Sequence, residues 1–349
     1  MNRNKLTVNQ TKIVQADSLE NGTLATDVPR DEAKRQESRS PRKNYRVSSV
    51  ILFFLLHLSC LAVFFVPFRW SYVAIAAGLY FLRMFGVTAG YHRYFSHRSY
   101  KLARVPQFLI AFLAETSGQK GVLWWAAHHR EHHQFSDTPR DVHSPIQEGF
   151  WWAHMGWIMS DNYDDYDPNL IRDYGKFAEL RWLDRNYLVP PFLLGAAVML
   201  LGGIPVFIWG FVVSTVLLYH GTFTINSLAH VWGKRRFDTH DDSRNNFVLA
   251  LITMGEGWHN NHHKFMYACR QGLRWWEVDC TFYVLKALSW VGITKELRKA
   301  RLVEDTAADK ADAATELAES RCRIAVRHSQ SQQNPTIPSD IVSGGDPVC

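Results

Sequence analysis

The sequence predicts an all-α membrane protein, with four transmembrane helices in two hairpins and a cytosolic helical cap that holds a dimetal site. Three observations lead to this prediction. Long apolar segments occur in two closely spaced pairs along the chain. The turn within each pair is short enough to send the chain straight back across the membrane. Most of the 16 histidines lie outside the apolar segments, in clusters that follow them.

The first apolar pair covers residues 47–68 and 70–90. The first member has His57 as its only basic or acidic side chain. At about 1.5 Å rise per residue it extends roughly 30 Å, enough to cross the hydrocarbon core of a bilayer. The second member carries Arg83 in its last third, where a long side chain can reach toward the interface. These two segments are predicted to form the first hairpin.

The second apolar pair covers residues 188–201 and 206–225. Two glycines and a proline within residues 202–205 predict a tight turn between its members. A further apolar segment, residues 105–113, is too short to span the membrane, and we expect it to lie at the interface. The alternative for all these segments is a soluble helical bundle, but two long apolar pairs are hard to bury in a chain of this size.

Two tight hairpins place both termini, residues 91–186 and residues 226–349 on one face of the membrane. Arg42, Lys43 and Arg46 precede the first span, and positive charge favours the cytosolic side. We therefore expect an integral multi-pass protein with cytosolic termini and cytosolic histidine clusters. The membrane would be the bacterial inner membrane or the endoplasmic reticulum.

The composition indicates one membrane domain between two polar tails. Residues 1–44 are charged and poor in large apolar side chains, so we expect a disordered N-terminal tail. Residues 45–303 form the predicted domain, and residues 304–349 form a second polar tail. The five cysteines show no disulfide framework, which favours a reducing compartment. The net charge of +6 is spread among apolar segments, so it indicates a cytosolic membrane face rather than nucleic acid binding.

The histidines form three clusters and one outlying pair. In the second and third clusters the histidines are spaced i, i+3 and i+4, so a helix would turn all three imidazoles to one face. The outlying pair is an asparagine and a histidine four residues apart, which a helix would also place on one face. The members are His92 and His97, then His129, His132 and His133, then His259, His262 and His263, and finally Asn226 with His230.

Eight or nine neutral imidazoles exceed what one ion can use, so the sequence predicts two metal ions. Imidazole suits Zn, Cu, Fe and Ni. A structural zinc site would be closed with four ligands, usually including Cys, and no Cys lies within the clusters. A membrane metal transporter is the alternative that is not an enzyme, but it would place the ligands within the spans rather than at their ends.

Carboxylates are expected to orient metal-bound imidazoles by accepting a hydrogen bond from the second ring nitrogen. Near the clusters the sequence offers Asp137, Asp141, Asp242 and Glu256 as candidates. His143 and His154 are further candidates, either for this supporting role or for contact with a substrate.

Four motifs resemble the acyl-CoA Δ9 (stearoyl-CoA type) fatty acid desaturase family. They are GVTAGYHRYFSHRSYK over residues 86–101, HREHH over 129–133, NSLAH over 226–230 and GEGWHNNHH over 255–263. Their order and spacing match the family from about residue 45 to residue 301. The stretch over residues 119–129 looks more like the bacterial branch.

The resemblance implies a four-span fold with a cytosolic cap that holds two iron ions. It assigns the nine clustered histidines as iron ligands and brings Asn226 to one iron through a water molecule. It further implies that O2 and two external electrons are used to insert a cis double bond, at Δ9 by analogy, into a saturated long-chain acyl-CoA. The electrons would come from a separate donor, such as cytochrome b5, ferredoxin or a reductase, because the chain contains no His-Pro-Gly-Gly haem motif.

Two departures from the animal enzymes bear on substrate recognition. Ala127 and His128 stand where those enzymes carry an Arg-Asp pair that helps to hold the CoA head, and Lys120 stands where they carry an Asn near the acyl chain. A lipid-bound acyl chain therefore stays open beside acyl-CoA. Lys120, Trp125 and Trp152 are the predicted substrate contacts. A histidine-box hydroxylase acting on lipids or alkanes is the closest alternative activity.

Overall fold

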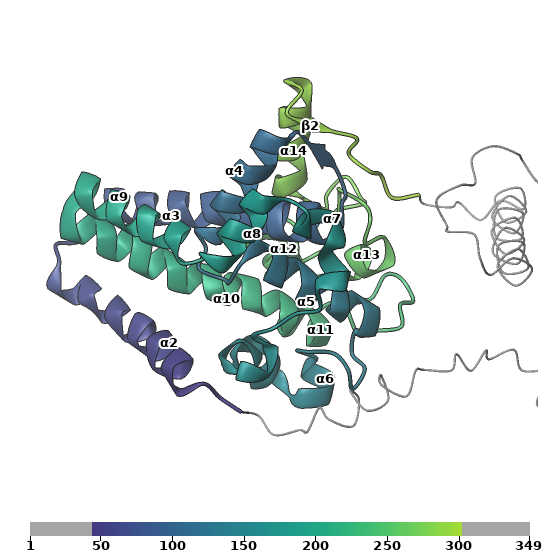
Figure 1. The fold of residues 1–349 in the computed structure, drawn as a ribbon, viewed down its shortest axis with the longest axis horizontal. Coiled ribbons are helices and arrows are strands. Elements are labelled where there is room, and N and C mark those ends of the chain that lie inside the picture. The colour runs from purple at the N-terminus through teal and green to yellow at the C-terminus, as the bar shows by residue number, and fades with distance from the viewer. Residues whose placement is uncertain (1–43, 302–349) are drawn as a thin grey trace, which may run out of the picture.

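The computed structural model describes residues 44–301, and most of the two predicted polar tails lies outside them. Within this range the protein is almost entirely helical, and Figure 1 shows long helices at one end and a cap of shorter helices at the other. The only sheet in the described range is a two-stranded one, in which β1 (Lys101–Leu102) pairs antiparallel with β2 (Thr294–Lys295).

The first apolar pair forms two long helical segments. The first consists of α2 (Val47–Ser59) and a 3-10 turn (Cys60–Phe65), and the second begins with α3 (Trp70–Phe85). The second segment continues as a π-helix (Gly86–Ser96), six residues beyond the predicted end of the span. This extension carries the helix into the cap and delivers the first histidine cluster there.

The second apolar pair is one helical run with a break. It consists of α9 (Val189–Val206), a π-helical turn (Phe207–Val213) and α10 (Ser214–Asn226). Gly203 has φ 70° and ψ −171°, a conformation that is open to glycine and costly for other residues. The chain folds back there, because Gly195 lies against the ring of Phe211, and Figure 1 shows α9 and α10 beside α3.

Three described helical segments are long and apolar enough to cross a membrane, namely Val47–Phe65, Trp70–Ser96 and Val189–Val231. The predicted third and fourth spans both lie within the last of these segments, on either side of the break at Gly203. Large apolar side chains on these segments are exposed, with Phe65 at 88% and Leu201 at 90%. Such a surface suits hydrocarbon better than water, which indicates a membrane protein.

The cap is built from short helices around a buried core. Tyr91 and Phe95 of the π-helix pack there with Leu123, Leu180 and Leu183, all of them almost fully buried. The cap helices are α4 (Arg104–Glu115), α5 (Val122–Phe135), α6 (Pro145–Glu148), α7 (Arg172–Gly175), α8 (Ala178–Arg185), α11 (Leu228–Val231), α12 (Phe247–Ile252), α13 (His259–Lys264) and α14 (Cys280–Trp290). Short 3-10 or π turns cover Trp152–Gly156, Trp157–Met159, Asp161–Tyr163 and Pro168–Ile171.

Three histidines outside the nine form a hydrogen-bonded string between the long helices. His57 of α2 lies with its Nε2 3.0 Å from Nε2 of His220 in α10. Nδ1 of His220 is 2.9 Å from Nε2 of His154, and Nδ1 of His154 is 2.9 Å from the hydroxyl of Ser227. Nδ1 of His57 is 2.7 Å from the carbonyl oxygen of Phe53. The string ties α2, which diverges from the other long helices in Figure 1, to α10.

Candidate metal centre

Helix α5 carries the second histidine cluster, and its first turn is fixed by carboxylates from other segments. Gly121 at the N-cap has no side chain to accept the free backbone N–H groups. The carboxylate of Asp184 accepts from the N–H groups of Leu123 (2.8 Å) and Trp124 (3.0 Å), and Glu115 accepts from that of Val122 (3.0 Å). The helix is thereby anchored with its histidine face toward the cap interior.

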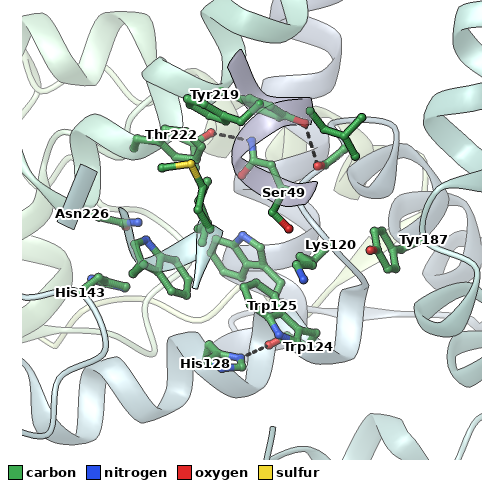
Figure 2. A pocket seen from close by; sticks show the side chains of 18 of the residues that line it. Ser49, Lys120, Trp124, Trp125, His128, His143, Tyr187, Tyr219, Thr222 and Asn226 are labelled. Atoms are coloured by element: carbon green, nitrogen blue, oxygen red, sulfur yellow. Dashed lines mark hydrogen bonds between the residues drawn. The ribbon is translucent and has the colours of Figure 1, made fainter. Parts of the chain in front are cut away.

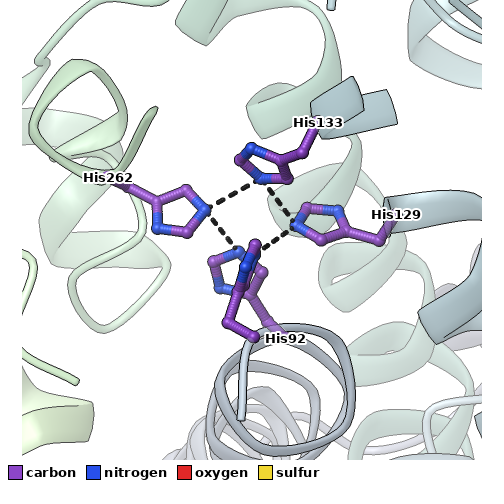
Figure 3. Close-up of side chains that lie close together, drawn as sticks. His92, His129, His133 and His262 are labelled. Carbon is purple, nitrogen blue, oxygen red and sulfur yellow. Dashed lines mark hydrogen bonds between the residues drawn. The ribbon is translucent and has the colours of Figure 1, made fainter. Parts of the chain in front are cut away.

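Five of the predicted ligands form a first group, in which the ligand atoms all lie within 4.8 Å of one another. Nε2 of His129 is 2.9 Å from Nε2 of His97 and 3.0 Å from that of His133. Nε2 of His262 is 3.0 Å from Nε2 of both His92 and His133. Figure 3 shows four of these rings turned toward a common centre.

The other four predicted ligands form a second group, which consists of His132, His230, His259 and His263. The Nε2 atoms of His230 and His259 are 3.0 Å apart. Nε2 of His263 is buried and has no hydrogen-bond partner among the described residues. A buried nitrogen without a partner is costly unless a ligand fills the site, so this atom fits a metal ion.

The first group is supported by one carboxylate. Oε2 of Glu256 is 2.5 Å from Nδ1 of His92. Burial opposes ionisation of Glu256, but His92 and Arg93 outweigh it and lower its pKa to about 2. Arg93 is itself almost fully buried and also pairs with Asp279 (2.9 Å). Glu256 is therefore charged at neutral pH and orients His92.

The second group is supported by three carboxylates. Nδ1 of His132 is 2.9 and 3.0 Å from the two carboxylate oxygens of Asp141. Nδ1 of His230 is 2.8 Å from Asp137, and Nδ1 of His263 is 2.6 Å from Asp241. Each contact leaves Nε2 of its imidazole directed at the centre of the group.

Asp137, Asp141 and Glu256 thus make the contacts predicted for them, but the prediction for Asp242 is wrong. The neighbouring Asp241 takes that place, while the Asp242 side chain pairs with Arg235 and Arg244. Adjacent aspartates in a loop cannot be told apart without the loop conformation.

Four of the imidazoles, two on α5 and two on α13, are held in the neutral form that binds metal. Burial lowers the pKa of His129, His133 and His262 well below 6.5, and the neighbouring rings lower it further. Burial likewise lowers the pKa of His263 to about 4. These rings are therefore neutral at pH 7 and have lone pairs to offer. The donor set, the orphaned nitrogen and the two separate groups together fit a pair of metal ions.

Asn226 and His230 do not lie on one continuous helix, contrary to the prediction. Helix α10 ends at Asn226, Ser227 has φ −108° and ψ −71°, and α11 begins at Leu228. The break sends the two side chains to different places. His230 joins the second histidine group, whereas Asn226 lines a cavity beside the metal centre.

This cavity has a volume of about 300 Å³ and extends from the start of α2 to the first histidine group. Figure 2 shows Trp125, His143 and Asn226 around it. One end is polar and contains Arg46 and Lys120. The middle is aromatic and aliphatic, and the inner end reaches an imidazole of the first group. The lining in the middle includes Leu52, Phe53, Leu56, Trp157, Tyr219 and Phe223, and the inner imidazole is that of His129.

A family model described as fatty acid desaturase matches residues 67–289 of the chain. The chain belongs to the fatty acid desaturase family. It is thereby an oxidoreductase of lipid metabolism, and both histidine groups lie within the residues that the family model matches.

Relatives of this desaturase include enzymes for lipid-bound and for CoA-bound chains. A palmitoyl-monogalactosyldiacylglycerol delta-7 desaturase from Arabidopsis thaliana is 40% identical over 245 residues, which is 69% of this chain but only 65% of that protein. An acyl-CoA 5-desaturase from Anemone leveillei is 36% identical, over 78% of this chain and 86% of that one. An sn-1 stearoyl-lipid 9-desaturase from Synechocystis is 38% identical, over 72% and 80%.

Two of the three predicted substrate contacts, Lys120 and Trp125, line the cavity of this desaturase. Trp152 does not. Its indole donates to the carbonyl of Val142 (3.2 Å), and the ring packs with Trp124 and Trp157, which do line the cavity. Sequence spacing could not distinguish these tryptophans, because the π turn at Trp152–Gly156 sets the direction of the side chain.

Proposed function

We propose that this protein is a di-iron fatty-acyl desaturase that inserts a cis double bond, at Δ9, into a saturated long-chain acyl group. One observation carries the proposal: the apolar cavity ends at an imidazole of the first histidine group. The ring of Trp125 stacks on that of His129, with centroids 4.9 Å apart and planes 23° apart. An acyl chain in the cavity would thus lie against the metal centre.

The nine histidines would hold two iron ions, five rings facing one and four facing the other. Iron is proposed because unactivated methylene groups require a redox-active metal, and imidazole is a ligand that iron accepts. Bound there, the two ions would supply the activation of O2. Overall, two hydrogens leave neighbouring carbons, and O2, two external electrons and two protons complete two molecules of water. The electrons would come from a separate donor protein.

The residues of the cavity have three roles in this proposal. The apolar middle, which contains Phe53 and Phe223, binds the methylenes and excludes water. The stacked pair of Trp125 and His129 limits how the chain can lie at the inner end. Asn226 lines the same end and is proposed to approach one iron through water. A fixed chain position determines which carbons react, since small displacements strongly affect such rates.

The proposal also includes a membrane topology. The break at Gly203 would separate a third and a fourth span, which gives two hairpins with the histidine groups on the cytosolic side. The carrier of the acyl chain is CoA or a membrane lipid, since the relatives include desaturases for CoA-bound chains and desaturases for lipid-bound chains.

The proposal is tested with purified, iron-loaded protein and a reconstituted electron donor. We expect two iron ions per chain and a product that lacks two hydrogens relative to the substrate by mass spectrometry. His132→Ala and His262→Ala should abolish this product, whereas the exposed His240→Ala should not. A product with one added oxygen would instead indicate the hydroxylase, and an active protein without iron would contradict the proposal.

A further inference from the structure

The mouth of the cavity contains two cations that share one carboxylate. Nζ of Lys120 is 2.8 Å from Oδ1 of Asp164, and the guanidinium of Arg46 pairs with the other oxygen of the same carboxylate. Arg46 and Lys120 are the only lysine or arginine residues among the described residues that line the cavity. Their charge is thus partly neutralised within the protein itself.

Lys120 is held in place and cannot readily turn outward. Its backbone has φ 69°, an uncommon conformation for a residue other than glycine, and its carbonyl accepts from the hydroxyl of Tyr91 (2.7 Å). The ammonium lies 5.5 Å from the ring centroid of Trp124 and 5.9 Å from that of Tyr187. Cation–π contacts of this kind add to the ion pair with Asp164. An incoming anion would have to compete with all of them.

The loop that supplies Asp164 is strongly acidic. Residues 161–167 contain four aspartates, and Asp161 and Asp165 are exposed. The loop is fixed beside the start of α2, because the N–H of Asp161 donates to Asn44 (3.2 Å) and that of Arg46 donates to Met159 (2.9 Å). These carboxylates therefore stand next to the mouth rather than on a distant surface.

From this arrangement we propose that the desaturase acts on acyl chains carried by a membrane lipid with an uncharged, hydroxyl-bearing head group, and discriminates against acyl-CoA. The inference rests on the proposed desaturase function. Phosphates at the mouth would meet the acidic loop at distances within a Debye length, about 8–10 Å in physiological salt. A hydroxyl both donates and accepts hydrogen bonds, so it can pair with the carboxylate and the ammonium side by side.

The test compares three carriers of the same stearoyl chain: stearoyl-CoA, a stearoyl galactolipid in vesicles and an anionic stearoyl phosphatidylglycerol in vesicles. Both turnover and binding are measured, the latter by quenching of tryptophan fluorescence. We expect the galactolipid to be preferred over each charged carrier by roughly tenfold or more in kcat/KM, because like charges at a mouth reduce association on this scale. Equal or better use of stearoyl-CoA or of the anionic lipid would overturn the inference.

A charge-reversal variant provides the second arm. Asp161→Lys with Asp165→Lys should improve stearoyl-CoA binding and turnover by roughly tenfold at low salt, less at high salt, and leave the galactolipid unchanged. The matched control, Asp238→Lys with Glu296→Lys, changes exposed carboxylates that do not line the cavity. It should leave the use of both stearoyl-CoA and the galactolipid unchanged. An unaltered carrier preference in the first variant would contradict the inference. Iron-loaded protein that binds the galactolipid selectively but desaturates no carrier would refute the proposed function and leave the head-group assignment supported.

Discussion

Replacing Asp141 with asparagine should weaken one metal site and spare the other. The Asp141 carboxylate is almost fully buried and accepts from Nδ1 of His132 at 2.9 and 3.0 Å. It also accepts from the N–H groups of Asp137 (2.8 Å) and His143 (3.2 Å). An asparagine keeps one acceptor oxygen, but its NH2 group then faces N–H donors. His132 thus loses the charged partner that fixes its orientation.

The expected magnitude follows from this geometry. Removing a carboxylate that orients a ligating histidine typically lowers metal affinity about 10- to 100-fold. This corresponds to about 1.4–2.7 kcal/mol of binding free energy. Only the second group contains His132, so the first group should keep its affinity. Glu256→Gln should have the opposite selectivity, because Glu256 contacts His92 of the first group.

The assay measures iron per chain after dialysis against a series of chelator concentrations. We expect wild-type protein to lose its two ions in two steps, Asp141→Asn to lose one ion at lower chelator concentration, and Glu256→Gln to lose the other. Anomalous X-ray scattering at the iron edge identifies the group that was emptied. Asp238→Asn, a change of an exposed carboxylate, serves as the control. Equal weakening of both sites by Asp141→Asn would refute the division of the nine histidines into two independently supported groups.

Three further changes test the scaffold around the site. Burial raises the pKa of Glu115 to about 8. Wild-type protein should therefore lose stability relative to Glu115→Gln as the pH rises from about 4.5 through about 8, by about 5 kcal/mol in thermal unfolding followed across that range. In Gly203→Ala the new Cβ would have no atom within contact distance. Holding alanine in the backbone conformation of Gly203 should nevertheless lower the free energy of unfolding by about 1–3 kcal/mol, which is measured as a lower Tm in detergent. An unchanged Tm would show that the backbone at the break relaxes. In Gly121→Ala the new Cβ would collide with Oδ1 of Asp184, so α5 must shift, and we expect the amount of bound iron to fall. Full iron content would contradict the anchoring role of Asp184.

The histidine set was predictable because its signals are local and repeated. The spacing within 129–133 and 259–263 needs only a helix to bring three rings to one face, and both segments are helical. The number of rings then indicated two ions. Membrane association was equally predictable from the sequence, because the apolar segments are long.

The residues that support the histidines and their helices were harder to predict, because their roles depend on contacts between segments distant in the sequence. The first turn of α5 is capped by Glu115, 7 residues away, and by Asp184, about 60 residues away. The N-cap residue Gly121 has no side chain from which the start of the helix could be predicted. Asp241 was missed in favour of its neighbour Asp242 because a loop has no periodicity from which side-chain direction can be deduced. The helix break at Ser227 likewise has no proline or glycine to mark it.

The string of His57, His220 and His154 also limits the width of the cavity. The carbonyl of Phe53 can only accept, so with neutral rings His57 donates from Nδ1, His220 from Nε2 and His154 from Nε2. If α2 moved outward, a ring nitrogen would lose its partner in surroundings that offer no water to replace it. The wall formed by α2 is therefore stiff, and the bore of the channel resists widening by a thicker or branched chain.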